Sequence, residues 1–150
     1  MIQRIQSVYL LVVTILIIIC LCSPVGSYIG SDYSVSALTN LCLTMADGTK
    51  DYAPWALFVI LLVVAVLAFG TIFLFKKRML QIRLTIFSTI LLIGYYATLV
   101  TFIFMLKEES MTFSLSWTVC LLLGAIIFIW LAIRAIGKDE VLVKAYDRLR

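Results

Sequence analysis

The chain has 150 residues, of which 64% are hydrophobic and 13% are charged, with a formal net charge of +4 and a mean hydropathy of +1.16. This balance is too apolar for a soluble globular domain, and the length allows four helices of about 20 residues that cross a bilayer but excludes a second domain. We therefore predict a single all-α membrane domain over residues 1–150, built as a four-transmembrane-helix bundle.

Four long apolar stretches predict the four membrane spans, at about residues 5–23, 54–75, 84–106 and 112–136. The first keeps bulky residues to its end, whereas a cleaved signal peptide has a shorter apolar region closed by small residues, so we interpret it as a retained span. Pro54 suits the start of the second span because proline is well tolerated in the first turn of a helix.

The segment between the first two spans, residues 24–53, is the only sizeable region without a long apolar run. Residues 33–37 and 41–45 alternate between apolar and polar side chains, and the pair Asp47-Gly48 that follows favours a hairpin turn. A small extracytoplasmic β-hairpin and an irregular loop over the helix ends are the two alternatives for this segment.

Basic residues fix the predicted orientation of the spans. Ten of the twelve Lys and Arg residues fall on one side, and only Lys50 and Lys107 fall on the other. Since cytoplasmic segments carry the excess of Lys and Arg, both termini are predicted to be cytoplasmic. The ten residues, which are also expected to face anionic lipid headgroups, are Arg4, Lys76, Lys77, Arg78, Arg83, Arg134, Lys138, Lys144, Arg148 and Arg150.

The tail after the fourth span, residues 137–150, has a helical pattern of its own. Leu142, Tyr146 and Leu149 share one face, and Lys144 and Arg148 lie on another. This pattern predicts a short amphipathic C-terminal helix that lies on the membrane surface or docks onto a partner. Alternatively, the charges only fix topology and solubilise the end, because so short a helix is marginal alone.

Three sequence blocks, at residues 1–11, 73–83 and 132–150, together resemble an uncharacterised family of small four-span bacterial inner-membrane proteins, described only as a domain of unknown function. The resemblance covers essentially the whole chain. It implies a multi-pass protein of the bacterial inner membrane, and it implies no activity, substrate or cofactor.

The chain has no histidine and four cysteines, Cys20, Cys22, Cys42 and Cys120, whose spacing matches no zinc site. Cys42 could form a disulfide with Cys22, or with Cys20, in an oxidising periplasm. Equally, these cysteines could be apolar packing residues. The absence of a C-x-x-C pair disfavours a membrane thiol oxidoreductase, which remains a second alternative function.

Hydroxyl groups are concentrated on the third span. An unpaired hydroxyl is costly in hydrocarbon, so we expect these groups to bond to Thr14, Thr71 or Thr118 on neighbouring helices, with Gly94 allowing close helix approach. A small-molecule pocket among them is the alternative. The residues concerned are Ser88, Thr89, Tyr95, Tyr96 and Thr98.

Function is predicted mainly from what the residues exclude. Charged residues are missing from the centre of every span, which disfavours proton-coupled transport, and the basic residues lack the aromatic platform of a nucleic-acid binder. We expect no enzyme, cofactor or metal, and predict an accessory or scaffolding subunit of a larger membrane complex. The alternative is a homo-oligomeric channel, transporter or lipid-handling protein built around the polar face of the third span.

Overall fold

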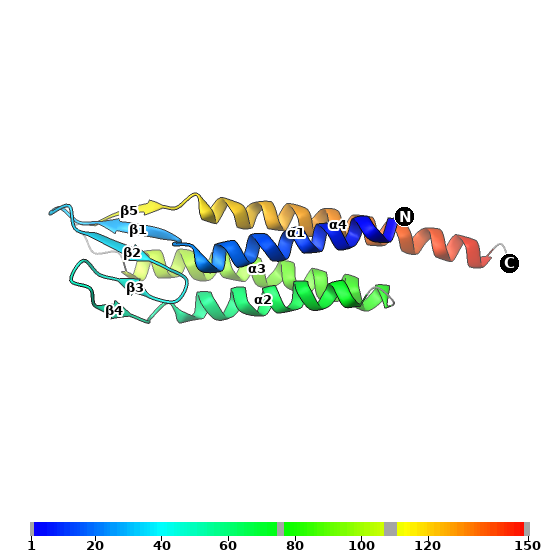
Figure 1. Cartoon of the computed structure of the whole chain (residues 1–150), viewed down its shortest axis with the longest axis horizontal. Coiled ribbons are helices and arrows are strands. Elements are labelled where there is room, and N and C mark those ends of the chain that lie inside the picture. The colour runs from blue at the N-terminus through cyan, green and yellow to red at the C-terminus, as the bar shows by residue number, and fades with distance from the viewer. Residues whose placement is uncertain (1, 75–76, 107–110, 149–150) are drawn as a thin grey trace.

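The computed structural model describes residues 2–74, 77–106 and 111–148, which form four helices and five short strands (Figure 1). The helices are α1 (Ile2–Cys22), α2 (Trp55–Phe73), α3 (Arg78–Leu106) and α4 (Thr118–Arg148). The strands are β1 (Gly26–Ile29), β2 (Val35–Leu38), β3 (Leu43–Thr44), β4 (Lys50–Asp51) and β5 (Thr112–Leu115).

The four helices lie side by side, and the strands gather at one end of them, which we call the sheet end (Figure 1). Helix α1 packs against α2 and α4, and α3 packs against the same two helices, so the bundle closes around one core. Each helix buries a stripe of apolar residues spaced three or four apart, such as Leu57, Leu61 and Val64 on α2. The outward faces are also apolar, which is typical of helices surrounded by lipid.

Three helical segments, Trp55–Phe73, Met79–Leu106 and Thr118–Tyr146, are long and apolar enough to cross a membrane, and α1 contributes the shorter apolar stretch Ser7–Cys22. At about 1.5 Å per residue, α2 is about 28 Å long, whereas α3 and α4 reach about 43 and 46 Å. The additional length of α3 lies at the sheet end, and that of α4 lies at the opposite end, where α4 runs past the start of α1 (Figure 1).

The strands form one antiparallel sheet in the order β4-β3-β2-β1-β5. Gly26 of β1 lies opposite Leu38 of β2 on one side and opposite Leu115 of β5 on the other. The prediction of a small antiparallel sheet is therefore confirmed, although the sheet is larger than one hairpin, because β1 and β5 were not expected.

The turn at Asp47-Gly48 is found where the sequence predicts it, between β3 and β4. Gly48 has a positive φ of 80°, and its N–H donates to the carbonyl of Met45 at 3.0 Å. The other alternating segment begins later than predicted, since Tyr33 lies in a turn with a φ of 60° and strand β2 starts at Val35.

The fourth predicted span begins too early, and the helix that contains it runs on beyond residue 136. Residues 112–115 form β5 rather than the start of the helix, because pairing with β1 satisfies their backbone groups and the Ser116 N–H donates to the carbonyl of Val25 at 2.9 Å. At the other end, α4 continues through Gly137 to Arg148, so the tail is not a separate short helix. One glycine weakens a helix but does not end it when helix-forming residues flank it on both sides.

Gly26 is required by the pairing of β1 with β5. A Cβ at this position would lie 2.5 Å from Phe113 Cζ and 2.8 Å from the backbone oxygen of Ser114. The replacement Gly26→Ala is expected to lower the free energy of unfolding by about 1–3 kcal/mol, because the β5 backbone must move. Thermal unfolding in a mild detergent, followed by tryptophan fluorescence, measures the loss.

The matched control is Gly94→Ala. Gly94 was expected at a close helix contact, but a Cβ there meets nothing within 4 Å. This variant should unfold at the wild-type temperature or slightly above it, since alanine favours the helix. Equal unfolding temperatures for both variants would contradict the β1–β5 pairing.

Candidate functional site

Asn40 joins the sheet to the helices. It lies between β2 and β3, and its side chain is 1% exposed. Its Nδ2 donates to the carbonyl oxygen of Cys20 in α1 at 2.7 Å, and its Oδ1 accepts from the hydroxyl of Tyr95 in α3 at 2.7 Å. The Asn40 carbonyl accepts from the N–H of Phe58 in α2 at 3.1 Å. One turn residue therefore bonds to three helices.

A second group of hydrogen bonds fixes the start of α4. Thr118 Oγ1 donates to the carbonyl of Pro24 at 2.9 Å and lies 2.6 Å from Ser116 Oγ. The hydroxyl of Tyr96 in α3 donates to the carbonyl of Val119 at 2.7 Å. Together with the bonds of Asn40, these hydrogen bonds connect all four helices to the sheet or to the segments that lead into it.

The hydroxyl partners differ from those predicted. Tyr95 and Tyr96 bond to Asn40 and to a backbone carbonyl, not to Thr14, Thr71 or Thr118. The other hydroxyls of the third span, those of Ser88, Thr89 and Thr98, donate to carbonyls four residues earlier in α3. Thr14 and Thr71 bond within their own helices in the same way. This local bond satisfies a hydroxyl in an apolar setting without a second helix.

All four cysteines are free thiols, so the predicted bridge from Cys42 to Cys22 or Cys20 is not formed. The Cys42 Sγ lies 3.6 Å from Thr39 Oγ1, within its own turn. Cys20 is buried, with its Sγ 3.8 Å from the carbonyl of Thr118 on α4. Asn40, and not Cys42, is the residue that reaches the end of α1. The described residues contain no group of three His, Cys, Asp or Glu side chains arranged to hold a metal ion.

Apart from Lys50 in β4, the basic residues whose side chains the structure describes lie towards the opposite end of the bundle from the sheet, and all are exposed. They are Lys77, Arg83, Arg134, Lys138 and Lys144. The Arg134 guanidinium stands over the Trp130 ring, 5.6 Å from its centroid, and Lys144 pairs with Glu140 at 2.9 Å. Lys76, Leu149 and Arg150 lie outside the described residues, as do the side chains of Arg4, Arg78 and Arg148.

The predicted docking residues Leu142 and Tyr146 belong to the last turns of α4. This segment, drawn in red, extends beyond the start of α1 (Figure 1). Both side chains are exposed to solvent, at 48% and 77% respectively. They are joined there by two further exposed apolar side chains, Val141 and Val143. The extension therefore presents apolar surface that no other described part of the chain covers.

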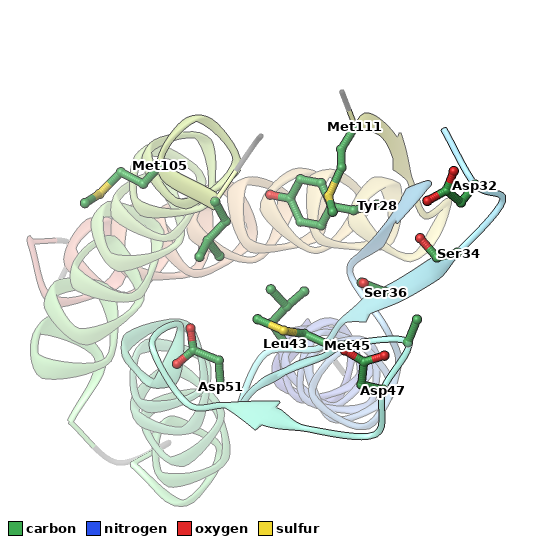
Figure 2. Close-up of a pocket in the computed structure, with 12 residues that line it drawn as sticks. Tyr28, Asp32, Ser34, Ser36, Leu43, Met45, Asp47, Asp51, Met105 and Met111 are labelled. Atoms are coloured by element: carbon green, nitrogen blue, oxygen red, sulfur yellow. The ribbon is translucent and has the colours of Figure 1, made fainter. Parts of the chain in front are cut away.

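A cavity of about 480 Å³ lies between the sheet and the sheet end of α3, and we call it the sheet cavity (Figure 2). Its volume is in the range of small-molecule sites. Three aspartates, three methionines and two serines contribute to its lining. These are Asp32, Asp47, Asp51, Met45, Met105, Met111, Ser34 and Ser36.

Two polar side chains of the sheet cavity are deeply buried. Tyr28 is 1% exposed, and its hydroxyl donates to the carbonyl of Ile103 in α3 at 3.3 Å. Burial raises the pKa of the Tyr28 phenol above its ordinary value. Ser36 is 7% exposed, its hydroxyl points into the cavity, and no described residue forms a hydrogen bond with that hydroxyl (Figure 2).

Sequence reasoning identified neither Asn40 nor the sheet cavity. The cavity forms between residues 28–51 and the segment from the end of α3 to Met111, which lie far apart in the chain, so no local sequence pattern predicts it. A weak signal exists for Asn40, which is the chain's single asparagine and stands in the apolar sequence Leu38-Thr39-Asn40-Leu41.

The hydrogen bond between Asn40 and Tyr95 can be tested with a double-mutant cycle. Asn40→Ala and Tyr95→Phe should each lower the free energy of unfolding by about 1–3 kcal/mol, with the larger loss at Asn40 because two side-chain bonds disappear. The effects should be non-additive by about 0.5–2 kcal/mol. Steric-trapping measurements in bicelles give these energies.

Thr101→Val serves as a control for this cycle, because the Thr101 hydroxyl bonds only to the carbonyl of Ala97 in its own helix. It should change the stability little. Strict additivity of the Asn40 and Tyr95 variants would show that the two side chains do not interact.

The family comparison agrees with the resemblance seen in the three sequence blocks. A family model described as a domain of unknown function, DUF4293, matches residues 2–149. No curated protein matches the chain. The expectation of an uncharacterised family is thus confirmed, and the match covers nearly every residue of the bundle and sheet. The chain belongs to the DUF4293 family of domains of unknown function.

Proposed function

We propose that this protein is a non-catalytic, four-span protein of the bacterial inner membrane, with both termini in the cytoplasm, that serves as an accessory subunit of a larger membrane complex. The charge distribution supports this orientation. Asp32, Asp47 and Asp51 lie at the sheet end, while the described basic residues other than Lys50 lie towards the opposite end. The positive-inside rule then places the sheet outside.

The packing of α1 supports a fourth span. With 21 residues, α1 is about 32 Å long, enough to cross a hydrocarbon core of about 30 Å. It packs against α2 and α4, both of which are long and apolar enough to span a membrane, and therefore shares their depth. Its outward residues Leu11, Ile15 and Ile18 are exposed and would face lipid tails.

The main observation in support of the accessory role is the exposed apolar surface on the part of α4 that extends beyond α1. Leu142 and Tyr146, four residues apart on one face of the helix, are 48% and 77% exposed on a part of α4 that would emerge into the cytoplasm. Apolar side chains exposed together on a surface outside the bilayer are typical of a protein-binding surface. A partner anchored in the same membrane, with a cytoplasmic helix beside α4, would cover them.

The burial of hydroxyl groups on α3 favours this role over a shared pore. Ser88 is 2% exposed and Tyr95 is fully buried within a single chain. These side chains are therefore unavailable to line a channel between copies of the protein.

Cysteine accessibility tests the topology. In a variant that retains only the buried Cys20, a cysteine at Asp47 should react with a membrane-impermeant maleimide in intact cells. A cysteine at Lys144 should react only after permeabilisation. Green fluorescent protein fused to the N-terminus should fluoresce, because it folds only in the cytoplasm. A dark N-terminal fusion would point to three spans, and labelling of both cysteines in intact cells would contradict the orientation.

The partner surface is tested by native purification of a tagged chain. The wild type should migrate in a complex larger than its own monomer. The double replacement Leu142→Glu with Tyr146→Glu should reduce recovery of the copurifying subunits by about tenfold or more, since interface anchors contribute at least about 2 kcal/mol. Quantitative mass spectrometry measures the recovery.

Thr49→Glu, on the exposed β3–β4 turn, is the control for an added charge at the other end of the molecule. It should leave the complex intact. A lone wild-type monomer, or a partner retained by the double variant, argues against the accessory role.

A further inference from the structure

We infer that the sheet cavity binds a small organic cation, one with an ammonium or guanidinium group on an apolar body. This binding site is separate from the accessory role and from the α4 extension, because it lies at the other end of the molecule (Figures 1 and 2).

The charge of the lining favours a cation. Asp32, Asp47 and Asp51 contribute three carboxylates, and no Lys or Arg is among the described residues that line the cavity. The neighbouring Lys50 does not line the cavity, and adjacent residues of a strand point to opposite faces. Carboxylates of one sign around a concave surface raise the local concentration of cations.

One of these carboxylates is held in place. Asp51 Oδ1 accepts from the N–H of Ala53 at 3.0 Å, which orients the side chain at the end of β4. The second oxygen of Asp51 has no hydrogen bond to any described residue. A positioned carboxylate loses less conformational freedom when it receives a cationic group.

Ser36 supplies a buried acceptor. Its side chain is more than nine-tenths buried, points into the cavity and has no hydrogen-bond partner among the described residues (Figure 2). The Ser36 hydroxyl oxygen reaches the surface of the cavity and is available to accept a hydrogen bond from a ligand N–H.

Methionines form the apolar part of the site. Met45 comes from the turn after β3 and Met111 from the segment before β5, and Leu106 at the end of α3 adds apolar lining from a third element, whereas the Met105 side chain points away from the cavity (Figure 2). Methionine side chains are flexible and polarisable, and adapt to hydrocarbon or aromatic groups of varied shape. An apolar body on the ligand would bury these surfaces, which a bare metal ion would not do.

The experiment uses the full chain in phosphatidylcholine nanodiscs and three probes of similar size. Phenethylammonium carries a cation, phenylpropionate an anion and phenylethanol no charge. Isothermal titration calorimetry, with empty nanodiscs as the blank, should show saturable binding of phenethylammonium, at least about tenfold tighter than binding of the other two. Its affinity should fall as salt rises, because ions screen the carboxylates.

Three variants locate the binding. Asp32→Asn with Asp51→Asn keeps the shape and removes two charges, and should weaken phenethylammonium binding about tenfold or more. Ser36→Ala should weaken it about threefold to tenfold. Glu140→Gln removes a carboxylate at the opposite end of the bundle and should leave the affinity unchanged.

Equal affinity for the three probes, unchanged affinity in the double Asp variant, or no saturable binding would overturn the inference. If the double variant does not fold, Asp32→Asn alone, an exposed position before β2, and the salt dependence of the wild type decide the question. Neither outcome depends on a partner protein, so failure here leaves the accessory role intact.

Discussion

The structure depends on one buried amide. Asn40 leaves the sheet at the turn between β2 and β3 and bonds to α1, α2 and α3 at the depth where the first two helices end or begin. Each of these bonds lies out of water, so a missing partner would cost more than an average hydrogen bond contributes. The hydrogen bonds of Asn40 consequently hold the sheet at a defined position on the bundle. The two walls of the sheet cavity, the sheet and the end of α3, are therefore fixed relative to one another.

Unequal helix lengths produce the surfaces at both ends of the molecule. The end of α3 extends beyond the level of Tyr95 and packs against the sheet, where Ile103 accepts from Tyr28. Without that extra length, the cavity would have no wall opposite β2. At the other end, α4 extends past α1 and exposes Tyr146. A four-helix core thus supports two separate surfaces.

Features set by local sequence could be predicted, and features set by distant pairing could not. A helix long and apolar enough to cross a membrane requires a long apolar run of sequence, and Asp47-Gly48 favours a turn through its own backbone preferences, so both features could be predicted. Strand β1 pairs with β5 across Gly26 and Leu115, and neither four-residue strand carries a signal for its partner. Sequence placed Cys42 and Cys22 on the same side but could not give the direction of their side chains, so it left a disulfide and free thiols as alternatives, and the structure has free thiols.

The position of β5 in the chain has a consequence for biosynthesis. Four strands precede α2, but the fifth follows α3, so the ribosome has made three helices before the sheet can be completed. The first helix also cannot complete its packing until α4 has been synthesised, because it packs against α4. Such late, long-range contacts slow folding. Until translation has passed Leu115, the edge of β1 lacks its final neighbour and remains open to pairing with other chains.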